Sequence, residues 1–109
     1  MWFWGKKERK EEIFVGFADE IGILDLQGVE EYLRSEEVRK VYLVARNPLG
    51  ERVLEYLKAR PLLRERIEFR QTDGIRGELK RIKRANSRYR VRTYDLREFG
   101  KRAMSLDLC

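Results

Sequence analysis

The centre of the hydrophobic pattern is an unbroken apolar run from Val41 to Ala45. A strand that is apolar at every position is typical of a parallel sheet covered on both faces, whereas a half-exposed strand alternates. Asn47 and Pro48 then provide a helix cap and a first helical residue. Apolar positions return at helical spacing as far as Leu57. This stretch therefore predicts a strand, a tight turn and a helix, which form one step of a βαβ unit.

The same two periodicities divide the rest of the chain. Strands are predicted over residues 13–17, 67–71, 89–93 and 103–108, and helices over residues 26–35, 48–59 and 75–85. Residues 18–24 fit either a loop or a short strand. Asp25 is the predicted cap of the first helix, and Pro61 ends the second. These elements predict one α/β domain of three layers, in which helices cover both faces of a mixed, mostly parallel sheet.

The composition is that of one charged domain. A chain of 109 residues has room for a single core, and we expect residues 1–12 to form an arm and residues 13–109 the domain. Charged residues make up 40% of the chain, and the bias towards Lys, Arg and Glu is typical of a heat-adapted protein. Cys109 has no partner for an intramolecular disulfide, and no segment approaches the ~20 apolar residues that span a bilayer. The sequence therefore predicts a cytoplasmic protein that does not enter a membrane.

The net charge of +6 is concentrated in one part of the chain. Residues 76–102 hold eleven basic and three acidic residues, so this stretch carries +8 and the remainder −2. The candidate phosphate contacts are four basic positions on one side of the last predicted helix, the arginines in and just before the following strand, and one lysine beyond them: Arg76, Lys80, Lys83, Arg84, Arg88, Arg90, Arg92 and Lys101. If they form one continuous patch, it attracts phosphates by counterion release and by the bidentate geometry of arginine.

The charge distribution favours a non-catalytic nucleic-acid-binding or DNA-associated accessory protein, and leaves the choice between DNA and RNA open. The alternative is a structural or interaction module whose basic stretch binds an acidic protein partner. The sequence contains no His, which excludes a Ser-His or Cys-His nucleophile, an imidazole base and a His-bearing zinc site. Its glycines follow neither the P-loop nor the G-x-G-x-x-G pattern. We therefore predict no catalytic residue, no metal and no cofactor.

Carboxylates are the remaining candidates for a site, and four of them follow predicted strands: Asp19, Glu20, Asp25 and Asp73. The E-x-K sequence from Glu78 to Lys80 adds the residue types of a Mg²⁺-dependent nuclease. In such nucleases the E-x-K sequence lies on a strand. Here it falls inside a predicted helix, five residues after Asp73. A Mg²⁺-dependent nuclease is therefore the less favoured alternative.

The succession of VYLVARNPLG with its helix, IEFRQ, a helix, RYRVRTYDL and FGKRAMSLD resembles one half of a phospholipase D-like domain, over about residues 38–107. Members of that family end this order of strands with H-x-K-x4-D, in which the His is the nucleophile and the Lys binds phosphate. Phe99 stands at the position of the His, Lys101 matches the Lys, and Asp107 comes one position late. The resemblance therefore implies a non-catalytic relative. It also implies a homodimer, because two such halves face each other in that family.

The aromatic residues Trp2, Phe3 and Trp4 lie near the start of the chain. Such side chains either fold back over an apolar edge of their own domain or anchor the chain at a partner. These aromatic side chains also lead us to expect a homodimer, because two-fold dimers are the commonest soluble oligomers.

Overall fold

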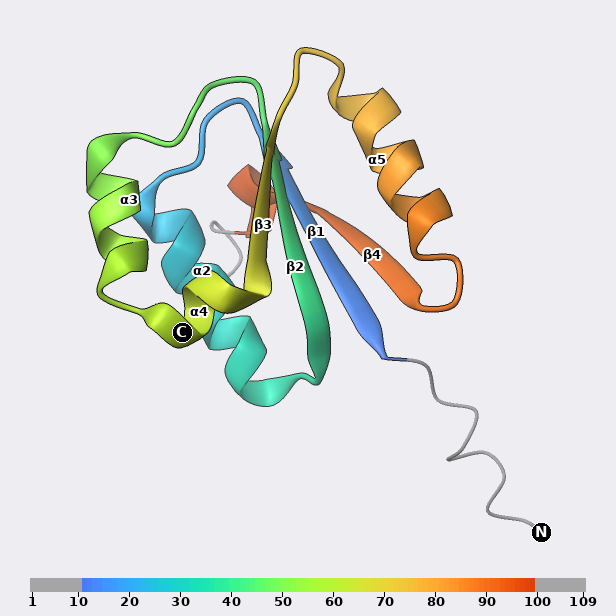
Figure 1. Cartoon of the computed structure of the whole chain (residues 1–109), viewed down its shortest axis with the longest axis horizontal. Helices are drawn as coiled ribbons and strands as arrows, with labels where there is room; N and C mark the ends of the chain where they lie inside the picture. The colour runs from blue at the N-terminus through green and yellow to red at the C-terminus, as the bar shows by residue number, and fades with distance from the viewer. Residues whose placement is uncertain (1–10, 100–109) are drawn as a thin grey trace, which may run out of the picture.

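The computed structural model describes residues 11–99, in which a parallel sheet is flanked by helices (Figure 1). The strands are β1 (Glu12–Ala18), β2 (Val38–Ala45), β3 (Ile67–Gln71) and β4 (Arg90–Asp95). The helices are α2 (Ile23–Ser35), α3 (Glu51–Lys58), α4 (Pro61–Arg66) and α5 (Ile75–Ala85), and residues 96–99 after β4 are also helical. The strand order is β3-β2-β1-β4, and every neighbouring pair is parallel. The predicted α/β domain is thus confirmed, with an all-parallel sheet over the described strands, while the strand predicted over residues 103–108 lies outside them.

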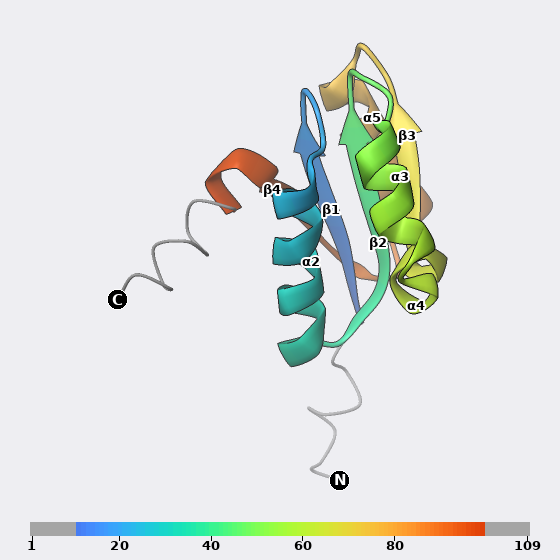
Figure 2. The same cartoon turned by 90° about the vertical axis from the view of Figure 1, so that its left-hand side faces the viewer.

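The sheet separates two cores. On one face, α2, α3 and α4 cover side chains such as Phe14, Val41 and Leu43; on the other, α5 covers Val15 and Val44 (Figures 1 and 2). Successive residues of a strand point to opposite faces, so a strand placed between two helical layers must be apolar throughout. This explains the unbroken apolar run of β2, in which every residue from Val41 to Ala45 is buried.

The starts of two helices differ from the prediction. Helix α2 begins at Ile23, and Asp25 lies in its first turn, where its carboxylate accepts a 2.8 Å hydrogen bond from the Gly22 N–H. Helix α3 begins at Glu51, not after Asn47. The Asn47 side chain instead donates a 3.3 Å hydrogen bond to the Asp19 carbonyl, which ties the loop after β2 to the loop after β1. Both predicted caps are therefore wrong in position.

Pro61 both ends and begins a helix. Helix α3 stops at Lys58, as the proline predicts, but the short helix α4 then starts at Pro61 itself. A proline is well suited to this first position, because its fixed φ is helical and the missing N–H would have no partner there. The sequence analysis missed α4. The ambiguous residues 18–24 form the end of β1, a loop and the start of α2, with no second strand.

The crossover through α5 determines which end of the sheet is open. The chain runs from β1 through β2 to β3 in one direction, and then returns through α5 to β4 on the far side of β1. Helix α5 starts at the carboxyl end of β3 and ends near the amino end of β4. It therefore crosses one face of the sheet obliquely (Figure 1). The carboxyl ends of β1 and β4 are therefore not covered by the body of α5. Within residues 11–99, no helix is long and apolar enough to cross a membrane.

Candidate functional site

Helix α5 presents one apolar and one basic face. Ile82 is buried against the sheet, and Ile75 and Leu79 pack beside it. Four basic side chains lie exposed on the opposite side, and we call them the α5 stripe: Arg76, Lys80, Lys83 and Arg84. The helix boundaries Ile75–Ala85 are those predicted from the sequence. The spacing of the four residues places them within an arc of about 100° around the helix axis. They therefore lie on one side of α5 because of the helical geometry alone.

The α5 stripe has no ion-pair partner among the acidic side chains of residues 11–99. Glu78 is the acidic residue of α5, and it lies buried on the side towards β3. Its carboxylate accepts a 2.6 Å hydrogen bond from Arg70 and lies 3.3 Å from the Arg81 guanidinium. Glu78 therefore compensates arginines outside the stripe. The E-x-K sequence consists of this paired Glu78 and an exposed Lys80, on a helix instead of the strand that the nuclease arrangement requires.

The arginines of β4 lie on the other side of the sheet from α5. In the parallel register, Arg92 is beside Phe14 and Val91 beside Ile13. Phe14 belongs to the core under α2, whereas Ile13 and Val91 belong to the core under α5. Arg90 and Arg92 therefore share the α2 face, and the helix and strand do not form the continuous patch that the sequence suggested. Exposed Arg88 lies in the turn between them, and Lys101 lies outside the described residues.

Arg92 lies beside a partly buried group of hydrogen-bonded side chains. The Tyr32 hydroxyl donates to the Glu12 carboxylate at 2.8 Å and lies 2.9 Å from the Tyr94 hydroxyl. Burial, followed by the hydrogen bonds to Tyr94 and Glu12, raises the pKa of Tyr32 well above its ordinary value. A hydrogen bond to Tyr94 is the main reason that the pKa of Arg92 is also raised. Glu12, which the sequence analysis assigned to the arm, is thus a buried residue of β1.

Phe99, which the proposed resemblance aligns with the His of phospholipase D-like domains, packs in an aromatic cluster. Its ring centroid lies 5.4 Å from that of Tyr94 and 5.6 Å from that of Phe14. A Cβ added to Gly28 of α2 would lie 3.2 Å from the Phe99 ring, so glycine makes room for this contact. Phe99 therefore serves packing in this chain, and Asp107 lies outside the described residues.

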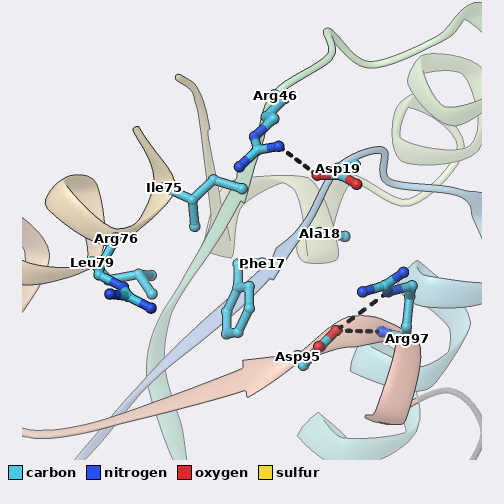
Figure 3. A pocket seen from close by; sticks show the side chains of 9 residues that line it. All are labelled: Phe17, Ala18, Asp19, Arg46, Ile75, Arg76, Leu79, Asp95 and Arg97. Carbon is cyan, nitrogen blue, oxygen red and sulfur yellow. Dashed lines mark hydrogen bonds and ion pairs between the residues drawn. The ribbon is translucent and has the colours of Figure 1, made fainter. Parts of the chain in front are cut away.

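A crevice of about 330 Å³ opens at the carboxyl ends of β1 and β4 (Figure 3). We call it the carboxyl-end crevice. Phe17 of β1 lies at its centre, with Ile75 and Leu79 from the first turns of α5 beside it (Figure 3). The charged residues of its wall come from four segments and comprise three arginines and two aspartates: Asp19, Arg46, Arg76, Asp95 and Arg97. Ligand sites of open parallel sheets occupy this same position, where the strand order reverses.

The ion pairs in the wall of the crevice are long and exposed. Arg46 lies 3.5 Å from the Asp19 carboxylate, and Arg97 lies 3.9 Å from that of Asp95. Three of the four side chains are more than half exposed. Pairs of this kind contribute about 0 to 1 kcal/mol. The arginines are therefore held only weakly by their present partners.

The carboxylates proposed from the sequence have different environments. Asp19 lines the carboxyl-end crevice, Asp25 closes the first turn of α2, and Glu20 and Asp73 are exposed in loops. Across residues 11–99, no three acidic or thiol side chains are arranged to hold a metal ion. Of the four candidates, Asp19 is the one that lines the carboxyl-end crevice.

Sequence analysis did not single out Arg46, Asp95 and Arg97 as a group. Each follows or ends a strand, and this position was the available signal, since residues at the carboxyl ends of parallel strands meet at one edge of the sheet. No family model, no curated protein and no solved structure matches this chain. The resemblance to a phospholipase D-like half-domain stays a prediction.

Proposed function

We propose that this protein is a non-catalytic nucleic-acid-binding protein that contacts the phosphate backbone through the α5 stripe. The observation that carries the proposal is the exposure of Arg76, Lys80, Lys83 and Arg84 on one helix face, without an acidic partner among residues 11–99. Unpaired basic side chains in a row attract phosphates, because binding releases the counterions condensed on the nucleic acid.

The dimensions of the α5 stripe suit a nucleic-acid backbone. Arg76 and Arg84 are separated by eight residues, or about 12 Å along the helix axis. One strand of a duplex presents a phosphate every 3.4 Å or so along its axis. Because each strand winds around the duplex, the four side chains of the stripe contact at most four phosphates, which need not be successive along one strand. Arg88 is also exposed, in the turn after α5.

Arg90 and Arg92 are proposed to have a secondary role. They lie on the α2 face of β4, which is an edge strand of the described sheet. Charged side chains on an edge strand prevent pairing with other chains, which explains these arginines without nucleic acid. A ligand on α5 would have to wrap around the edge of the sheet to reach them. We therefore expect their contribution to binding to be smaller than that of the stripe.

The proposal is tested by measuring the affinity for a labelled duplex, by fluorescence anisotropy, at several salt concentrations. Four phosphate contacts predict that log K falls with log salt at a slope of about −3.6, or about 150-fold between roughly 50 and 200 mM salt. Absence of binding at low salt, or a flat response, would refute the proposal. A parallel titration with poly-glutamate tests the acidic-partner alternative, which predicts equal or tighter binding of the polypeptide. Comparing DNA with RNA duplexes determines the type of nucleic acid.

A further inference from the structure

The carboxyl-end crevice has the features of a site for one phosphorylated nucleotide. Its volume of about 330 Å³ lies at the lower end of the range of small-molecule sites, which is enough for a single nucleotide and too small for a duplex. It is separate from the outward face of α5, and the two meet at Arg76, which belongs to both.

The arginines of the crevice can exchange their partners for a phosphate. Arg46 and Arg97 are paired with Asp19 and Asp95 at long distances in exposed positions, and Arg76 has no acidic partner in the described part of the chain. Arginine binds phosphate through two parallel hydrogen bonds, which are stronger than a single-contact exposed pair. A phosphate can therefore displace the aspartates from the arginines at little cost. The aspartates then remain available to accept hydrogen bonds from sugar hydroxyl or base amino groups.

The centre of the crevice supplies an aromatic ring for the base. Phe17 lies between the Asp19–Arg46 pair and the Asp95–Arg97 pair among the residues that line the crevice, and it is partly buried (Figure 3). Ile75 and Leu79 continue the apolar surface. Bases of any sequence stack on aromatic side chains in single-strand binding proteins. An aromatic centre ringed by arginines matches a base and its phosphate better than it matches an inorganic anion.

We infer that the carboxyl-end crevice binds a nucleoside 5′-monophosphate group, as the terminal nucleotide of a strand whose backbone continues along the α5 stripe. The base lies on Phe17, and the phosphate lies at the edge of the crevice on Arg46 or Arg97, two of the three arginines around that ring. That the bound nucleotide is the end of a nucleic-acid strand rests on the proposed function, because the rest of that nucleic acid must then lie along α5. Binding of a free nucleotide does not depend on it.

The inference is tested by calorimetry in the presence of a chelator, with adenosine 5′-monophosphate, adenosine and inorganic phosphate as ligands. We expect the monophosphate to bind at least about tenfold more tightly than either of the others, since each lacks one half of the contacts. Equal binding of the monophosphate and inorganic phosphate would overturn the role of Phe17, and equal binding of the monophosphate and adenosine would overturn that of the arginines. Absence of binding by all three would overturn the site.

The strand end is tested with a short oligonucleotide that carries either a 5′-phosphate or a 5′-hydroxyl. The 5′-phosphate is expected to strengthen binding about tenfold in the wild-type protein and not in Arg46→Gln/Arg97→Gln. The control variant Arg34→Gln/Arg52→Gln removes two exposed arginines from α2 and α3 and should keep the tenfold difference. Equal loss in both variants, or no difference in the wild type, would overturn the inference. Nucleotide binding without duplex binding would refute the proposed function and leave the nucleotide site standing.

Discussion

Replacing Gly16 by alanine is expected to destabilise the protein, because Leu96 occupies the space that a side chain would need. Gly16 lies in the middle of β1 on the face of the sheet that α2 covers. A Cβ added there would lie 2.7 Å from Leu96 Cδ2, 3.1 Å from Leu96 Cγ and 3.2 Å from Phe14 Cε1. Carbon atoms in contact are normally about 3.5 to 4.0 Å apart. Leu96 and Phe14 are fully buried, so neither can turn into solvent to relieve the overlap.

Inserting a methyl group into such a core costs about 1 to 3 kcal/mol, and we expect about 2 kcal/mol for Gly16→Ala. For a domain of this size, the midpoint of thermal unfolding should fall by about 10 °C. Gly77→Ala is the matched control, since no atom beyond its chain neighbours and the backbone of its own helix lies within 4 Å of the added Cβ. Gly77 is exposed within α5, where alanine should stabilise the helix by about 0.5 to 1 kcal/mol. The same substitution thus has opposite effects at the two sites.

The pair Gly16 and Leu96 can be tested further by a double-mutant cycle in urea. Leu96→Ala alone should cost about 2 to 5 kcal/mol, since it leaves a cavity. The double variant should be more stable than the sum of the two losses predicts, by about 1 kcal/mol or more, because the smaller residue 96 makes room for the new Cβ. Strict additivity, or a Gly16→Ala variant as stable as the wild type, would refute the packing of residues 96–99 on β1. Such a result would also remove the basis for the position of Arg97 in the carboxyl-end crevice.

Three further predictions concern pH, capping and assembly. Burial, with the hydrogen bonds to Tyr94 and Glu12, raises the pKa of Tyr32 in the folded protein. The free energy of unfolding should therefore decline above about pH 10, where the tyrosine of the unfolded chain ionises first. Urea unfolding between about pH 8 and 11 measures this decline, and a free energy that does not change with pH contradicts it. Asp25→Ala should lower the free energy of unfolding by about 1 kcal/mol because the Gly22 N–H loses its acceptor, whereas Asp25→Asn keeps an acceptor oxygen; equal losses in urea unfolding would contradict the capping role. Light scattering should give about twice the chain mass of 13.2 kDa, and a mass that stays at 13.2 kDa at all concentrations would exclude the predicted homodimer.

The elements that sequence predicted well are those whose signal is local. The boundaries of β3 and α5 are as predicted, because alternation and helical periodicity are complete within each segment. The cap assigned to Asn47 failed for the opposite reason. The Asn47 side chain could cap the helix that follows it. It instead donates a hydrogen bond to the Asp19 carbonyl, 28 residues earlier in the chain.

The arrangement of charge required information that no local pattern contains. Whether Arg92 shares a face with Lys80 depends on the register between β1 and β4 and on the face that α5 crosses. Both properties arise from packing of distant segments. The carboxyl-end crevice depends likewise on the strand order, which brings the residues after β1, β2 and β4 together. Sequence analysis therefore identified the basic residues of α5 but misjudged their continuity with β4.

The most direct test of the central claim compares the salt dependence of duplex binding between two variants that each lose two positive charges. Lys80→Gln/Lys83→Gln removes half of the α5 stripe, whereas Arg52→Gln/Lys58→Gln removes two exposed charges from α3, on the other face of the sheet. If the stripe binds phosphates, the first variant should reduce the slope of log K against log salt by about 1.8, from about −3.6, and the second should leave the slope unchanged. Equal changes in the two variants would show that binding follows net charge alone, and would contradict a role for this face of α5.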